Sequence, residues 1–252
     1  MNMQQNTTDF NIHNANFKFF DPDDSIAKET MLGKIYEPGV TSILIDVIKN
    51  AKCFLDIGAH YGYFSCLVGK LNNSCAVHAF EPGAAHISIF DHNILINGVT
   101  AKLHKVALSD RNGNAAFKGR TLTKEIENIE SVEEIIFDDW CANNNVRADI
   151  AKIDVHGAEG KVLYGMKKAL TNDIKHLLIE IHASHLLLDY SYKEILSVLK
   201  ETGFRIYELV DFRENENAQS VELTGTAYDN FVDPKKWTEY QIKNERMIYA
   251  TK

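Results

Sequence analysis

The chain contains no run of lysine or arginine residues. Its 252 residues include 27 Lys and Arg against 35 Asp and Glu, and the formal net charge at pH 7 is −8. A protein that binds nucleic acid or an anionic membrane surface needs a positively charged face. The composition therefore predicts neither a nucleic-acid partner nor a membrane partner. It favours a neutral or cationic substrate, although a local basic pocket is compatible with an acidic average.

Long apolar stretches and paired cysteines are also missing. No apolar run approaches the roughly 20 residues that span a membrane, and residues 1–14 lack the basic-then-apolar order of a secretory signal. Cys53, Cys66, Cys75 and Cys141 form no Cys-x-x-Cys pair, which is typical of reduced thiols. These absences predict a cytoplasmic protein, and nothing in the sequence specifies its oligomeric state.

Length and hydrophobicity indicate one large domain. A chain with 45% hydrophobic and 25% charged residues has a globular composition, and 252 residues suit one α/β domain better than two. The polar residues 1–18 are expected to form a flexible tail, followed by a single domain over 19–252. An insertion at about 111–147 interrupts that domain, and its glutamate-rich part, 122–145, is expected to be solvated.

The most specific pattern begins at a short apolar run, Cys53–Ile57. This run ends in the turn Gly58-Ala59-His60-Tyr61-Gly62 and continues as a helical pattern, and a second apolar run, Ala76–Phe80, ends in Glu81. A strand, a glycine turn, a helix and an acid at the tip of the next strand are typical of a nucleoside-binding βαβ unit. In such a unit the Glu81 carboxylate would accept hydrogen bonds from both ribose hydroxyls.

The spacing of the glycines indicates which nucleoside is bound. A dinucleotide fingerprint reads G-x-G-x-x-G, but here His60 replaces the middle glycine and Tyr63 the last, while Asp56 stands two residues before Gly58. This bulky, acidic turn suits a cationic ligand without phosphate, such as S-adenosylmethionine. A nicotinamide-dependent oxidoreductase, disfavoured by the missing middle glycine, and a non-catalytic module with a degenerate pocket remain as alternatives.

Apolar segments alternate with helical patterns along most of the chain. Strands are predicted at 53–57, 76–80, 103–107, 150–155, 176–181 and 204–210, and helices at 35–50, 63–70, 85–97, 160–170 and 192–202. A last strand is predicted at 228–232, with 246–250 as the alternative. Strands that are apolar on both faces indicate a Rossmann-like α/β fold, in which helices cover both faces of a mostly parallel sheet.

Five phrases together resemble the FkbM family of S-adenosylmethionine-dependent methyltransferases. They are Tyr36-Glu37-Pro38, Asp56-Ile57-Gly58-Ala59, Phe80-Glu81-Pro82, Ala107-Leu108-Ser109-Asp110 and Lys152-Ile153-Asp154-Val155-His156-Gly157-Ala158-Glu159. The resemblance spans about residues 35–210. It implies S-adenosylmethionine as the cofactor and a seven-strand class I methyltransferase sheet, with six parallel strands and one antiparallel strand near the end. Where the family usually carries a glutamate, this chain has His156.

The motifs and the resemblance together predict which residues form the site. The cofactor-binding candidates are Glu37, Asp56, Gly58, Ala59, His60, Gly62, Glu81, Pro82, Ala107, Leu108 and Asp154. Of these, Ala107 and Leu108 are expected beside the adenine because of the resemblance alone.

Three residues are the catalytic candidates: Asp154 at a strand tip, which is also a cofactor-binding candidate, His156 two residues later, and His182 at the next strand tip. A hydroxyl acceptor must lose its proton during attack, and an imidazole titrates near neutral pH, so His156 is the first candidate for the base and His182 the second. Asp154, His182 and His185 lack a diagnostic metal-binding spacing, and no metal is predicted.

The resemblance also bears on the acceptor. It suggests O-methylation of a small molecule, either a sugar or another natural product, with the nitrogen of a peptide or an amine as the alternative.

Overall fold

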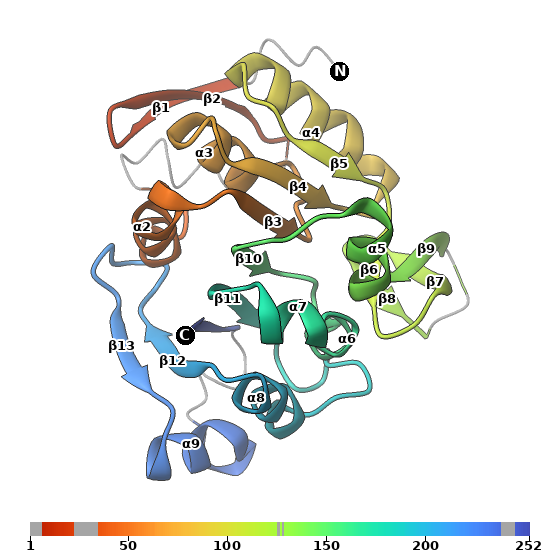
Figure 1. Ribbon diagram of the computed structural model, residues 1–252, viewed down its shortest axis with the longest axis vertical. Coiled ribbons are helices and arrows are strands. Elements are labelled where there is room, and N and C mark those ends of the chain that lie inside the picture. Colours follow the sequence, from red (N-terminus) through yellow and green to blue (C-terminus); the bar gives the residue numbers. More distant parts are fainter. Residues whose placement is uncertain (1–6, 23–34, 125–126, 128, 238–244) are drawn as a thin grey trace.

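The computed structural model describes residues 7–22, 35–124, 127, 129–237 and 245–252. A sheet of eight strands runs through the long axis of the molecule (Figure 1), in the order β13-β12-β14-β11-β10-β3-β4-β5. Its strands are β3 (Cys53–Ile57), β4 (Ala76–Phe80), β5 (Lys102–His104), β10 (Ile150–Ile153), β11 (His176–Ile181), β12 (Arg205–Val210), β13 (Gln219–Glu222) and β14 (Arg246–Thr251). The predicted α/β class is confirmed.

The strand directions follow the expected plan. Strands β5, β4, β3, β10 and β11 pair in parallel, and β14 lies antiparallel between β11 and β12. The sheet gains an eighth strand because β13 pairs antiparallel with the outer edge of β12. The predicted strand at 228–232 is wrong, since these residues lie in helix α9 (Gly225–Val232). Their apolar residues have helical spacing, whereas the alternative, 246–250, lies within β14.

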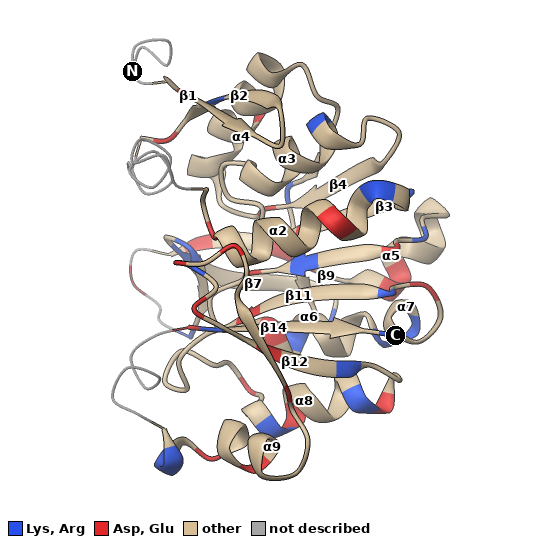
Figure 2. Cartoon of the chain, turned by 90° about the vertical axis from the view of Figure 1, so that its left-hand side faces the viewer, with Lys and Arg blue, Asp and Glu red and all other residues tan. Residues whose placement is uncertain are grey.

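Helices cover both faces of the sheet. Helices α2 (Pro38–Val47), α3 (Tyr63–Leu71) and α4 (Ala84–Asn97) lie on one face, and α5 (Phe137–Asn144), α6 (Glu159–Gly165), α7 (Lys167–Asn172) and α8 (Tyr192–Glu201) on the other. Neighbouring residues of β3 point to opposite faces of the sheet and so belong to different cores. Phe54 packs with the α2–α3 core, while Leu55 and Ile57 pack with the α6–α8 core. From the side, α2 lies in front of the sheet (Figure 2).

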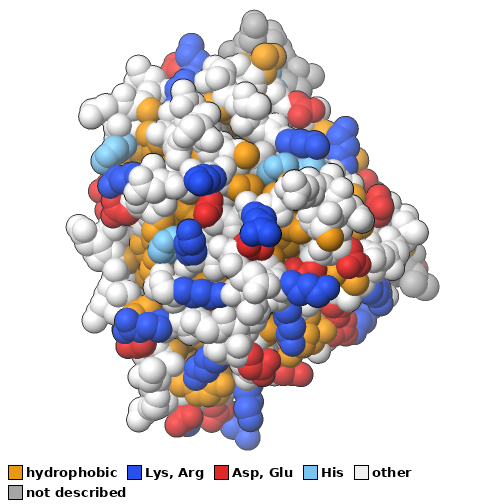
Figure 3. Space-filling model, viewed as in Figure 1, with side chains coloured by type: hydrophobic (Ala, Val, Ile, Leu, Met, Phe, Trp, Pro, Cys, Tyr) orange, Lys and Arg blue, Asp and Glu red, His pale blue; other side chains and the backbone are white. Residues whose placement is uncertain are grey.

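Short 3₁₀ helices, η1 (Ile48–Asn50) and η2 (Pro234–Lys236), complete the helical elements of the described ranges. Within these ranges no helix combines the length and the apolar character needed to cross a bilayer. On the face drawn in Figure 3, Lys and Arg side chains are interspersed with Asp and Glu and do not gather into one basic area.

The predicted insertion folds as a second, four-stranded sheet beside α5 (Figure 1). Its strands are β6 (Ala107–Ser109), β7 (Gly113–Lys118), β8 (Thr121–Thr123) and β9 (Glu130–Ile136), in the order β6-β9-β7-β8. The single strand expected over 103–107 is therefore divided between two sheets. The expectation of a solvated segment over 122–145 is wrong for β9, where Val132 and Glu134 are buried. The Glu134 carboxylate is held by a hydrogen bond from Ser109 Oγ (2.9 Å).

The flexible tail predicted for residues 1–18 is wrong for residues 7–18, which belong to a hairpin of β1 (Thr7–Ile12) and β2 (Ala15–Phe20). The hairpin is ordered because Ile12, Phe17 and Phe19 are buried in the α2–α3 core. Asn93 of α4 also fixes its end: Phe20 N donates to Asn93 Oδ1 (2.8 Å), and Asn93 Nδ2 donates to Phe20 O (3.0 Å). Residues 1–6 lie outside the described part.

Candidate active site

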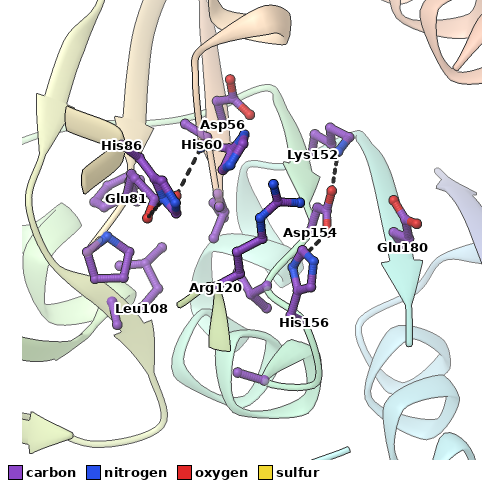
Figure 4. A pocket seen from close by; sticks show the side chains of 18 of the residues that line it. Asp56, His60, Glu81, His86, Leu108, Arg120, Lys152, Asp154, His156 and Glu180 are labelled. Atoms are coloured by element: carbon purple, nitrogen blue, oxygen red, sulfur yellow. Dashed lines mark hydrogen bonds and ion pairs between the residues drawn. The ribbon is translucent and has the colours of Figure 1, made fainter. Parts of the chain in front are cut away.

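A cavity of about 320 Å³ opens where β3, β4, β10 and β11 end, the edge at which open parallel sheets bind ligands. The predicted residues on its wall are Asp56, Gly58, Ala59, His60, Glu81, Pro82, Ala107, Leu108, Asp154, His156 and His182. Figure 4 shows Glu81 and His86 on one side and Lys152, Asp154 and Glu180 on the other. Two predicted residues, Glu37 and Gly62, do not line the cavity.

The two turn glycines have structural reasons that the sequence did not reveal. Gly58 has a φ of 79°, and a Cβ there would lie 1.8 Å from the carbonyl oxygen of Asp154. Gly62 has a φ of 83°, and a Cβ would lie 2.8 Å from the ring of Phe90. Both positions thus require glycine for the chain's own packing. Gly58 also lines the cavity, and the close approach of a ligand there stays a prediction.

Asp56 lies at the end of β3 with 2% of its surface exposed. Ser65 Oγ of α3 donates a hydrogen bond of 2.7 Å to Asp56 Oδ2. Burial raises the pKa of Asp56 to about 6, even though Ser65 and the Lys152 ammonium favour the charged form. At neutral pH the site therefore holds a buried carboxylate that a cationic ligand would stabilise.

Glu81, at the tip of β4, is held by three protein donors. Its Oε2 accepts from the backbone N of His60 (2.9 Å), and its Oε1 accepts from Gly83 N (2.8 Å) and lies 3.0 Å from His86 Nδ1. These contacts orient the carboxylate toward the turn after β3. His86 was not a predicted site residue, because a histidine inside a helical pattern carries no signal of a spatial partner.

A group of buried charges lies beside the cavity. Glu37 precedes α2 with a φ of 43° and is 1% exposed, and neither of its carboxylate oxygens has a hydrogen-bond partner within the described ranges. Its nearest cation is Lys152 Nζ, 4.0 Å away, and Lys152 in turn contacts Asp154 Oδ2 at 3.1 Å. The neighbouring Glu180 carboxylate accepts a hydrogen bond from Arg213 Nη2.

Lys152 and Arg213 were missed by the sequence reasoning. A lone lysine in the apolar strand β10 was a signal that went unused, because burial of an ammonium demands acidic partners. Burial disfavours the charge on Lys152, yet Asp154 and Glu37 together hold its pKa above the ordinary value. Arg213 follows the end of β12 and carries no local signal, since its partner comes from another strand.

The three catalytic candidates converge at the ends of β10 and β11. Asp154 Oδ1 lies 3.6 Å from His156 Nδ1 and 3.8 Å from His182 Nε2, and the two imidazole rings stack with centroids 4.5 Å apart. We name Asp154, His156 and His182 the Asp-His-His cluster. His185, the other histidine considered at this edge, is exposed and does not belong to it.

Glu159 fixes one ring of the Asp-His-His cluster. It begins α6, as expected for an acid at a helix N-terminus, and its Oε1 accepts from Gly157 N (2.9 Å) and lies 2.7 Å from His182 Nδ1. Burial lowers the proton affinity of His182, but Glu159 and Asp154 outweigh it and raise the pKa of His182 to about 9. Burial is the largest effect on His156, and it lowers the pKa of that imidazole. At neutral pH, His182 is therefore cationic and His156 is neutral.

Comparisons with known proteins agree with this architecture. The family model of the methyltransferase FkbM domain matches residues 56–206. The hexuronic acid methyltransferase AglP of Haloferax volcanii is 25% identical over 154 residues, which cover 58% of this chain and 63% of that relative. The match thus spans less than two thirds of the relative's length.

Two solved structures show the shared fold. A S-adenosylmethionine-dependent methyltransferase from Agrobacterium tumefaciens has a TM-score of 0.52 and 11% identity, and the match covers 98% of this chain and 70% of that one. Fibrillarin from Aeropyrum pernix, solved with S-adenosylmethionine bound, has a TM-score of 0.50 and 10% identity, with 97% and 82% covered.

Proposed function

Because the chain belongs to the FkbM methyltransferase family, we propose that it transfers the methyl group of S-adenosylmethionine to a hydroxyl of a sugar-like small molecule. The observation that carries this proposal is the cavity itself. Buried carboxylates stand where a cationic cofactor would bind, and the Asp-His-His cluster stands where an acceptor would meet it. The similarity to a hexuronic acid methyltransferase supports a sugar as the acceptor.

The residues present fit S-adenosylmethionine, whose methionine end carries an ammonium and a sulfonium. Glu37 lies beside the cavity and 4.0 Å from Lys152 Nζ, and neither of its oxygens has a hydrogen-bond partner among the described residues. Its carboxylate therefore suits the ammonium, which would supply the missing hydrogen bonds. The Glu81 carboxylate can accept hydrogen bonds from the ribose hydroxyls through the lone pairs that its protein donors leave free. The apolar part of the cavity wall at Ala107 and Leu108 suits the adenine. We therefore assign these residues to the cofactor, together with Asp56, which lies just before the glycine turn.

When bound, S-adenosylmethionine supplies a methyl group on a cationic sulfur. The chain's task is to hold the acceptor oxygen in line with that methyl and to remove its proton. In the Asp-His-His cluster, His182 is held as a cation by Glu159 and cannot accept a proton. The neutral imidazole of His156 can, and its 37% exposed side chain lies where an acceptor would enter.

Arg120, in the turn between β7 and β8, supports an acidic acceptor. It lines the same cavity as His156, and Figure 4 shows its guanidinium directed toward the space before Asp154. A guanidinium binds a carboxylate through two parallel hydrogen bonds. A uronic acid, with a carboxylate beside its hydroxyls, would place the carboxylate at Arg120 and a hydroxyl at the Asp-His-His cluster.

The test is methyl transfer from labelled S-adenosylmethionine to a panel of acceptors: glucuronic and galacturonic acids, the corresponding neutral hexoses, and a set of amines and peptides. We expect labelled O-methyl uronic acid, and a loss of turnover of about 10²–10⁴ in His156→Ala with cofactor affinity unchanged. His185→Ala is the matched control and should retain activity. Labelling of amines or peptides but of no sugar would overturn the proposal.

A further inference from the structure

We infer that Asp154, His156 and His182 form a binding site for one divalent transition-metal ion at the acceptor end of the cavity. Each residue offers one ligand atom, and the three atoms lie within 4.8 Å of one another. Two imidazoles and one carboxylate are a donor set that favours manganese, iron, cobalt or zinc over magnesium or calcium, which prefer oxygen ligands alone. The inference rests on the proposed function for its chemical role but not for the binding itself.

The two oxygens of the Asp154 carboxylate have different surroundings. Its Oδ2 contacts the Lys152 ammonium at 3.1 Å, while its Oδ1 is buried and has no hydrogen-bond partner among the residues described. The atoms nearest to Oδ1 in the cluster are His156 Nδ1 and His182 Nε2, at 3.6 and 3.8 Å. Both distances are too long for hydrogen bonds. Two ligands that share an ion at about 2.1 Å lie roughly 3.0–3.5 Å apart, so a small contraction would complete the site.

His182 is already oriented as a ligand. Its side chain is 3% exposed, and Glu159 Oε1 lies 2.7 Å from its Nδ1, so that Nε2 is directed at Asp154. A carboxylate that holds the distal nitrogen of a histidine is the usual outer contact of a metal-bound imidazole. Binding of the ion requires Nε2 without its proton, so affinity for the ion should fall as the pH is lowered.

The ion would change how the acceptor loses its proton. Three protein ligands leave coordination positions for a hydroxyl and a neighbouring oxygen of the acceptor, and coordination lowers the pKa of that hydroxyl. The proton then leaves to solvent beside the half-exposed His156. The new O–CH₃ bond forms as the S–CH₃ bond breaks, and the electron pair of that bond remains on sulfur. Without the ion, proton transfer to His156 alone supports a slower reaction.

The binding experiment uses the whole chain without cofactor or acceptor. Co²⁺ is titrated into the protein while the visible absorption of bound Co²⁺ is followed, and free Mn²⁺ is followed by electron paramagnetic resonance. We expect one ion per chain, a loss of affinity of at least about tenfold in His156→Ala, and no change in His185→Ala. His156→Glu keeps a ligand atom and should shift the preference from Co²⁺ toward Mn²⁺.

The outcomes separate the metal site from the proposed function. Failure of the wild-type chain to bind either ion at millimolar concentration would overturn the site, as would binding by His156→Ala as tight as in the wild type. Uronic acid methylation that a chelator leaves unchanged would also overturn it while the proposed function stands. Binding of one ion through His156, with no methylation of any sugar, would leave the site in place and overturn the proposed acceptor.

Discussion

Replacing Asp56 with asparagine should stabilise the free protein at neutral pH. The carboxylate is 2% exposed, and burial raises its pKa from an ordinary value of 3.8 to about 6. The native state therefore holds this proton more tightly than the unfolded chain, so its contribution to stability is complete below pH 3.8 and is lost as the pH rises through 6. Each tenfold difference in proton affinity corresponds to about 1.4 kcal/mol, which makes the loss about 3 kcal/mol at pH 7.5.

Asparagine avoids this loss and keeps an oxygen that can accept from Ser65 Oγ, which now bonds to Asp56 at 2.7 Å. Urea unfolding without cofactor should show Asp56→Asn more stable than the wild type by about 3 kcal/mol at pH 7.5 and by about half of that at pH 5. Calorimetry should show at least about tenfold weaker binding of S-adenosylmethionine, because the charge that faces a cation is lost. Equal stabilities at both pH values would refute the reasoning, and so would a variant that is less stable at pH 7.5.

Three further substitutions test other parts of the site. Gly58→Ala should lower the free energy of unfolding, measured by urea titration, by more than about 3 kcal/mol. The new Cβ would lie 1.8 Å from the carbonyl oxygen of Asp154, and the backbone φ of 79° disfavours any side chain. A variant as stable as the wild type would contradict this clash. Glu81→Ala should weaken calorimetric binding of the cofactor by about ten- to a hundredfold, and unchanged affinity in a folded variant would remove Glu81 from the ribose. Glu37→Gln should weaken it by about tenfold, because the buried carboxylate loses the charge that faces the ammonium. A variant that binds normally would assign the ammonium to another group.

The elements near the glycine turn could be predicted closely, because each is specified by local sequence. The strand Cys53–Ile57 and the strand Ala76–Phe80 have the predicted bounds, because a short apolar run between polar turns is typical of a buried strand. The C-terminal region was less predictable. Residues 228–232 and 246–250 are both short segments with three or four apolar or aromatic residues. The choice between them depended on which segment could reach the gap between β11 and β12.

The N-terminal hairpin illustrates a different limit of sequence patterns. Residues 7–18 are polar enough to suggest a tail, yet the side chains of Ile12 and Phe17 are buried, as is that of Phe19 in the same hairpin. Their burial depends on α2, α3 and α4, which come later in the chain and supply both the apolar surface and the Asn93 hydrogen bonds. A short hairpin is stabilised mainly by what it packs against.

The sequence by itself determined the fold class, the family and the set of polar residues at the strand tips, because period, turn chemistry and motif order are local properties of the chain. The tertiary structure alone decided how those residues pair. It oriented His182 through Glu159 and left Asp154 Oδ1 facing two imidazoles, while Lys152 occupied the other oxygen. It also gave Gly58 a packing role against a carbonyl 96 residues away in sequence, Asp154. Distances and burial between separate strands set the proton affinities of these groups, and they exist only once the sheet has formed.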